Sequence, residues 1–332
     1  MIELELTSLD LARLRFASSP VWELIASLRT LRDRSRHYMC RPWLSAARGR
    51  LGGLRLDLLS ALVPPGLAPD FVTPTPTRPW GTLEEELETV ATVPAATVRA
   101  SLEEAYQDQG RPLPPVLRPL SEDPAAHLPA LVTELRRYWQ AAVEPVWPRL
   151  RALAAADLAY RMERFAAGGI AAVLADLHPQ TAFAHGQLVI DKPSRCRHRV
   201  DLAGTGVLLL PCVFAWPSTI VVCCSAAQPA LAYSPRGVAG FWRTAPPDPP
   251  DPLGALLGRT RAVLLAALSL PVTTTELARQ VGISPPAVSQ QLKVLKATGL
   301  VTAHRRGRLV VYQRTTAATA LLATARPDQT AG

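Results

Sequence analysis

The chain of 332 residues contains no asparagine, and only three of its 36 lysines and arginines are lysine. We interpret this bias as the codon usage of a GC-rich genome, so the abundance of arginine by itself indicates no function. Cysteine is also scarce, odd in number and irregularly spaced, which does not predict a disulfide framework. The cysteines are Cys40, Cys196, Cys212, Cys223 and Cys224. Because no secretory signal pattern opens the chain, we expect a cytoplasmic location.

One long segment lacks charged residues, between Asp201 and Arg236. Within it, Val207 to Ala227 is long enough to span a bilayer. However, prolines, Ser218 and Thr219 interrupt it, and its β-branched residues are clustered. We therefore predict a pair of buried strands around a turn near Trp216 and Pro217, and we expect no membrane partner.

A hydrophobic content of 48% allows a sizeable core and two domains. Helical spacing of apolar residues dominates up to about Gly169, and short strands with turn residues between them follow Gly186, so an antiparallel sheet is expected there. The sequence predicts an α+β fold in which this mostly helical N-terminal region precedes a separate C-terminal domain. The predicted parts are residues 1–245, a proline-rich linker at 246–252, the C-terminal domain at 253–325 and a disordered tail at 326–332.

The C-terminal segment carries the signals of three helices. The first is expected over Leu253 to Leu270. Thr273 and Glu276 have the spacing of a capping box for a second helix from Thr274 to Val281. A third helix is expected to begin after Ser284 as N-cap, with Pro285 at its first position, and to end before Gly299.

The third helix has two different faces. Val288, Leu292 and Leu295 form an apolar stripe that we expect to pack against the preceding helices. The opposite face is small and polar at its start and basic further on, which suits a helix whose first half contacts DNA bases and whose later residues contact phosphates. An ordinary solvated helix face is the alternative interpretation. We consider Ser289 and Gln290 the best candidates for base contact, and Gln291 lies nearer the flank.

A basic β-hairpin is expected after Gly299, with strands at Leu300 to Arg305 and Arg308 to Arg314. Nine basic residues lie between positions 259 and 314 against one acidic residue, Glu276, which gives 9 − 1 = +8 of the chain's net +9. Charge concentrated on one small module is typical of a protein that binds the phosphate backbone of DNA. The candidate DNA-binding residues are Ser284, Pro286, Ser289, Gln290, Gln291, Lys293, Lys296, His304, Arg305, Arg306 and Arg308.

Residues 253–325 resemble the winged helix-turn-helix of the ArsR family of bacterial transcriptional regulators. The resemblance rests on the segments TTELARQVGIS, PAVSQQLKVLKATGLV and RRGRLVVYQRT. It implies a repressor that binds an inverted-repeat operator in double-stranded DNA as a homodimer, formed largely by the first and last helices of the module. It also implies release by an effector, here an unidentified small molecule. The long N-terminal region resembles extensions found on some actinobacterial members, and we expect it to sense the effector or support the dimer.

The chain departs from the family at several positions. Paired cysteines of metal-sensing members are replaced by Ala278 and Gln280, and the metal ligands of the final helix are absent from Thr316 to Leu322. Prolines stand at 285 and 286, where the family commonly has polar residues, and glutamines at 290 and 291, where it often has a histidine. We therefore expect neither of the family's metal sites, and we assign no metal or cofactor.

Two other functions are considered. The N-terminal region lacks a glycine-rich phosphate loop, a nucleophile elbow, a metalloprotease motif and a CxxC pair, so we expect no enzyme and assign no catalytic residue. An enzyme domain fused to a DNA-binding module remains one alternative. The other is a thiol- or metal-responsive sensor that uses Cys196, His198, Cys212, Cys223 or Cys224, although buried structural cysteines are the simpler interpretation.

Overall fold

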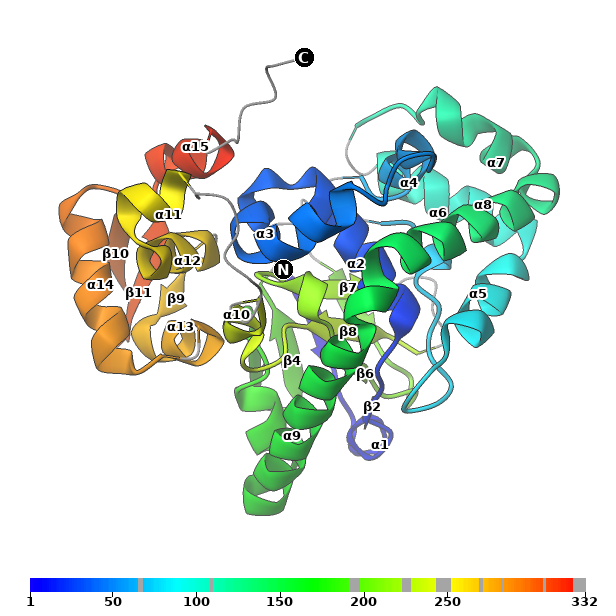
Figure 1. Cartoon of the computed structure of the whole chain (residues 1–332). Helices are drawn as coiled ribbons and strands as arrows, with labels where there is room; N and C mark the ends of the chain where they lie inside the picture. The colour runs from blue at the N-terminus through cyan, green and yellow to red at the C-terminus, as the bar shows by residue number, and fades with distance from the viewer. Residues whose placement is uncertain are drawn as a thin grey trace, which may run out of the picture. The chain divides into compact units, whose positions relative to one another are not determined.

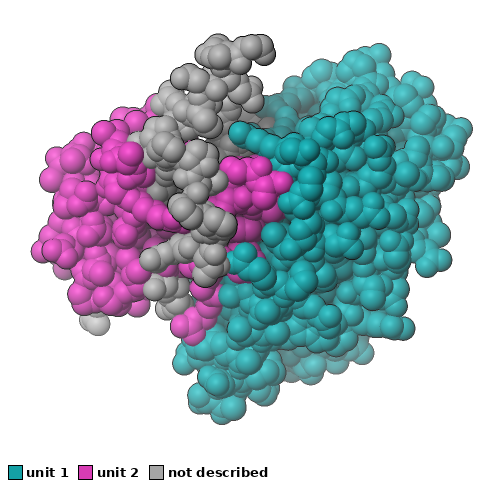
Figure 2. Space-filling model, in the orientation of Figure 1, with its two compact units in different colours: residues 1–32, 47–235 teal, residues 33–46, 236–332 magenta. Residues whose placement is uncertain are grey.

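The computed structural model describes all residues except 65–67, 108–109, 192–197, 223–227, 243–251, 269–270, 282, 307–308 and 325–332. The chain divides into two compact units (Figure 2). The first comprises residues 1–32 and 47–235, and the second comprises residues 33–46 and 236–332. The predicted linker lies outside the described residues except for Pro252, as does the predicted tail. The fold is α+β with a C-terminal winged helix-turn-helix, as the sequence predicts.

Helices make up most of the first unit (Figure 1). They are α1 (Ser8–Ala12), α2 (Pro20–Arg32), α4 (Leu56–Ala61), α5 (Leu83–Ala91), α6 (Ala95–Gln107), α7 (Arg118–Glu122), α8 (Pro124–Tyr138) and α9 (Trp147–Ala175). Helix α2 is buried over almost its whole length, including Glu23 and Ser27. Such all-round burial identifies α2 as the central helix of this unit.

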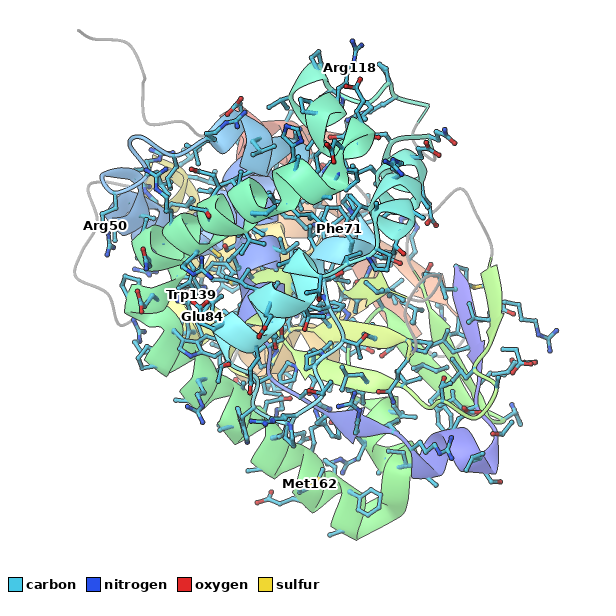
Figure 3. All side chains as sticks on the ribbon, turned by 90° about the vertical axis from the view of Figure 1, so that its right-hand side faces the viewer. Arg50, Phe71, Glu84, Arg118, Trp139 and Met162 are labelled. Atoms are coloured by element: carbon cyan, nitrogen blue, oxygen red, sulfur yellow. The ribbon has the colours of Figure 1, made fainter. Side chains whose placement is uncertain are left out.

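Helix α9 is broken at Gly168 and Gly169, where φ is −156° and +64°. The two arms on either side of the break are held together by side chains, because Tyr160 donates to Oδ2 of Asp176 over 2.6 Å and Arg161 pairs with the same carboxylate. Met162, labelled in Figure 3, lies six residues before the break and is half exposed. The glycine pair therefore turns one long helical segment into a hairpin.

Two four-stranded sheets complete the first unit. One has the order β3-β4-β1-β5, from Thr181–Ala184, Gln187–Ile190, Ile2–Glu5 and His198–Asp201; the other has the order β2-β6-β8-β7, from Arg15–Phe16, Leu208–Pro211, Ala230–Tyr233 and Ile220–Val222. Leu4, Leu188, Leu209 and Leu231 meet in one core cluster between the sheets.

Of the strands expected after Gly186, β7 and β8 pair antiparallel with each other, as predicted, and β4 pairs antiparallel with β3 and β1. Three other pairs are parallel: β1 with β5, β2 with β6, and β6 with β8. The sequence did not reveal this, because β1 and β2 come from the start of the chain, and β6 pairs with β8 although β7 lies between them in the sequence. The uncharged segment from Val207 forms β6 and β7. None of the helices that the structure describes is long and apolar enough to cross a membrane.

The second unit contains the C-terminal module, α3 (Arg34–Arg48) and α10 (Val238–Phe241). The helices of the module are α11 (Pro252–Leu257), α12 (Arg259–Ala267), α13 (Thr274–Val281), α14 (Pro285–Ala297) and α15 (Thr316–Thr324). Its sheet has the order β10-β11-β9, from Val301–Arg306, Leu309–Arg314 and Val272–Thr273. The single helix expected over 253–270 is two helices, because Gly258 adopts a φ of +80° that breaks the helical path.

Candidate nucleic-acid interface

Side chains fix the starts of both helices in the helix-turn-helix, as predicted. The Thr273 amide donates to Glu276 Oε2 over 3.0 Å, and the Glu276 amide donates back to Thr273 Oγ1 over 3.3 Å, which completes a capping box before α13. Ser284 Oγ accepts from the Ala287 amide over 3.4 Å at the start of α14. At the other end of α14, Gly299 has a φ of +70°. The turn residue Gly282 lies outside the described residues.

The buried stripe of α14 sets which face of the helix is free. Val288 and Leu292 are fully buried and Leu295 is 1% exposed. They pack within a module whose other helices contribute Leu264, from α12, and Leu277, from α13. This packing confirms the predicted stripe and turns the opposite side of α14 outward.

The structure shows how far each predicted residue of α14 can be reached from solvent. The exposed residues are Ser284, Pro286, Gln290, Lys293 and Lys296. Ser289 and Gln291 are half-buried, so they lie at the border between the outward face and the packed stripe. Gln290 and Lys293, three positions apart, share one side of the helix. The outward face thus combines an amide and an ammonium group over one turn.

One contact was not foreseen from the sequence. Nε of Arg261, on α12, donates to Oε1 of Gln291 over 2.9 Å, and Nη1 of Arg261 donates to the Leu257 carbonyl over 3.1 Å. The sequence alone showed Arg261 only as one of the basic residues of the C-terminal module. No local signal could have revealed it, because the two side chains meet through the packing of α12 on α14.

The hairpin β10–β11 forms the wing, which lies beside α14 (Figure 1). His304 and Arg305 are exposed on β10. Arg306 is the last residue of β10 and pairs with Leu309. Arg308 lies outside the described residues. The wing therefore carries exposed basic or titratable side chains on a strand that contacts α14.

Arg314, one of the nine basic residues counted in this module, lies partly inside it rather than on its surface. It is half-buried, and its Nη1 donates to the Ala266 carbonyl over 3.2 Å. Burial lowers the pKa of its guanidinium group, while the charge of Asp33 raises it. Arg314 thus connects the base of the wing to α12, so the charge available at the surface is smaller than the sequence count suggests.

Cys212, one of the residues of the alternative thiol or metal sensor, is buried. Its Sγ donates to Oε2 of Glu23 over 3.2 Å in the interior of the first unit. Burial, followed by the charge of Glu23, raises the pKa of this thiol far above its ordinary value, so Cys212 stays protonated. Cys196, Cys223 and Cys224 lie outside the described residues. Across the described part of the chain, no group of three or more His, Cys, Asp or Glu side chains could hold a metal ion.

Comparisons with known proteins match two parts of the chain. Residues 256–304 match a helix-turn-helix domain family, and residues 95–237 match a family of unknown function (DUF5937). The HTH-type transcriptional regulator NmtR of Mycobacterium tuberculosis is 43% identical over 61 residues, which cover 18% of this chain and 51% of the relative. The chain therefore spans about half the length of that relative. No solved structure matches. The C-terminal unit thus contains a helix-turn-helix domain of the kind found in a bacterial transcriptional regulator.

Proposed function

We propose that the chain is a sequence-specific DNA-binding transcriptional regulator. The observation that carries this proposal is the outward face of α14, where Gln290 and Lys293 are exposed because Val288, Leu292 and Leu295 hold the other side of the helix in the core. A helix of this kind fits the major groove of B-DNA, where amide groups bond to base edges and basic groups to phosphates.

Each part of the interface has a separate role. Ser289 and Gln290 contact base edges, and Gln291 contributes at the flank. Lys293 and Lys296 bind phosphates beyond the bases, while Ser284 and Pro286 at the start of α14 approach the DNA backbone. The wing, with His304, Arg305, Arg306 and Arg308, reaches the neighbouring phosphates or the minor groove, where arginine is favoured electrostatically.

The chain acts as a repressor that binds an inverted-repeat operator as a homodimer. The sequence likeness to NmtR, named an HTH-type transcriptional regulator, supports a regulatory role. Two copies of α14 related by a two-fold axis would meet half-sites roughly 34 Å apart. The first unit, which includes most of the proposed domain at residues 1–245, binds a small-molecule effector in the cytoplasm and lowers the affinity for DNA.

Salt dependence of binding tests the phosphate contacts. The probe is the genomic duplex that the full-length chain binds most tightly, and its dissociation constant is measured from 50 to 300 mM salt. Lys293→Ala should weaken binding and reduce the slope of log affinity against log salt by roughly 1.8, because each subunit of the proposed dimer loses one phosphate contact. Gln290→Ala should instead reduce the preference for this duplex over a scrambled one by about tenfold.

Arg118→Ala is the matched control, because Arg118 is exposed on α7 in the first unit (Figure 3) and its loss removes the same charge. This variant should retain the wild-type salt slope and preference. If Lys293→Ala and Gln290→Ala behave like Arg118→Ala, α14 does not face DNA and the proposal is wrong.

A further inference from the structure

The hydrogen bond between Arg261 and Gln291 determines which end of the glutamine amide is available. The N–H at Nε of an arginine can donate but never accept, so the atom that it meets 2.9 Å away must be the amide oxygen. Within the described part of the chain, no group accepts a hydrogen bond from the Gln291 amide nitrogen. Its two N–H groups are therefore the available end of the side chain.

Arg261 is itself fixed by a second contact. Its Nη1 donates to the carbonyl of Leu257, the last residue of α11, over 3.1 Å. The side chain is half-buried, and a planar guanidinium held at two atoms loses most of its freedom to turn. Arg261 is thus a rigid support for the Gln291 amide rather than a mobile surface charge.

The neighbouring glutamine provides a contrast. Gln290 is exposed, and the structure records no hydrogen bond to its side chain from any described residue. Its amide can turn to present both the oxygen and the nitrogen, which is the arrangement needed for two bonds to adenine. Gln291 cannot exchange its two ends in this way while Arg261 holds the oxygen, so the amide nitrogen is the end turned away from the guanidinium. Two adjacent residues of the same type therefore have different hydrogen-bonding capacities.

We propose that Arg261 is a positioning residue that fixes the Gln291 amide so that its N–H end reads one base. This inference rests on the proposed function. In the major groove, the N–H end of an amide bonds to acceptors, which are N7 and O6 of guanine, N7 of adenine and O4 of thymine. Cytosine offers a donor, its N4 amino group, at the same edge. Gln291 therefore selects against cytosine on the strand that it contacts, by about tenfold.

Base selection from randomised duplexes tests this inference with the full-length chain. At one position of each half-site, the wild-type chain should retain few duplexes with cytosine. Arg261→Ala frees the amide of Gln291 to turn, so this discrimination should fall to about twofold while the other positions keep their preferences. Arg261→Lys should restore part of it, because an ammonium group also only donates. Arg259→Ala, which removes the same charge from α12, is the control and should leave the base preference unchanged.

Gln291→Glu provides an independent test, because a carboxylate keeps Arg261 paired but can only accept hydrogen bonds. It should reverse the preference at the same position towards cytosine or adenine, whose amino groups donate. If Arg261→Ala does not fold, Arg261→Lys and this variant decide the question together. The inference is wrong if Gln291→Glu leaves the preference unchanged, or if Arg259→Ala alters it as much as Arg261→Ala does. If the wild-type chain shows no base preference at any position, the proposed function itself fails.

Discussion

The indole rings of Trp43 and Trp242 lie 6.5 Å apart between centroids, with 47° between their planes. Trp43 belongs to α3, near the start of the chain, and Trp242 directly follows α10, yet both lie in the second unit. Trp43 is 2% exposed and Trp242 is 3% exposed. The unit that contains the helix-turn-helix is therefore built from two distant segments of the chain.

Trp43→Ala should destabilise the second unit by about 3–5 kcal/mol, because it removes a buried ring and leaves a cavity beside Trp242. Urea unfolding followed by tryptophan fluorescence measures the loss. Ser45→Ala, at an exposed position of the same helix, is the control and should change the free energy of unfolding by less than about 0.5 kcal/mol. If the two variants unfold at the same urea concentration, α3 is not part of the core of this unit.

Tyr233→Phe should destabilise the first unit by about 1.5–3 kcal/mol. The hydroxyl of Tyr233 donates to Oδ2 of Asp157 over 2.6 Å, and both side chains are buried. Phenylalanine keeps the ring 5.2 Å from the Arg161 guanidinium but removes one charge-assisted hydrogen bond. Tyr160→Phe removes a hydrogen bond of the same length to the more accessible Asp176, and should cost less. Thermal unfolding of both variants measures the two losses of stability. A larger loss of stability from Tyr160→Phe than from Tyr233→Phe would contradict the prediction.

The buried Glu23 should make stability depend on pH. Burial raises the pKa of this carboxyl to about 7, although the Phe214 and Val213 amides and the Cys212 thiol, which donate to it, act in the opposite direction. Between the ordinary value of 4.5 and about 7, the folded chain holds a proton that the unfolded chain has released. The contribution of Glu23 therefore falls as pH rises through this window, by up to about 1.4 kcal/mol per pH unit.

Glu23→Gln removes this titration, so its free energy of unfolding should fall less steeply than that of the wild type between pH 4.5 and 7. Glu86, buried beside Ser19, has its pKa raised to about 7 mainly by burial, and Glu86→Gln should act in the same direction. Urea unfolding at half-unit pH intervals measures the slopes. If the free energy of unfolding depends on pH equally in the wild type and in Glu23→Gln, the expectation is wrong.

The capping box before α13 should contribute to the stability of the helix-turn-helix. Thr273→Ala removes the hydroxyl that bonds to both the carboxylate and the amide of Glu276, and should cost about 1–2 kcal/mol. Thr273→Ser keeps the hydroxyl and should recover most of the loss. Hydrogen exchange at the amides of α13 reports the change locally, and equal exchange rates in both variants would argue against a role for the cap.

The sequence predicted best those features that neighbouring residues determine. The bounds of α13 and α14 were expected because Thr273, Glu276, Ser284 and Gly299 mark helix ends through their own backbone and side-chain bonds. The buried stripe of α14 was equally clear from the helical spacing of its apolar residues. In the candidate site, this local information was enough to assign Lys293 and Gln290 to the outward face.

Features that depend on distant segments were not predicted. Helix α3 has an apolar stripe that includes Met39, Trp43 and Leu44, but a stripe does not reveal which distant segment it packs against, so nothing in its sequence indicated that it joins the C-terminal unit. An isolated glycine does not reveal its own φ, so the break at Gly258 went unseen. Burial of Arg314 and the bond from Arg261 to Gln291 arise from packing between helices and strands, which the local sequence pattern does not encode.

Selection from genomic DNA tests the central claim most directly. The full-length chain is incubated with fragmented DNA from its own genome at about 150 mM salt, and the retained fragments are sequenced. The account predicts strong enrichment of a few fragments that share an inverted repeat, and loss of this enrichment when Gln290 and Lys293 are both replaced by alanine. Retention of all fragments in proportion to their length, or enrichment that survives both replacements, would contradict it.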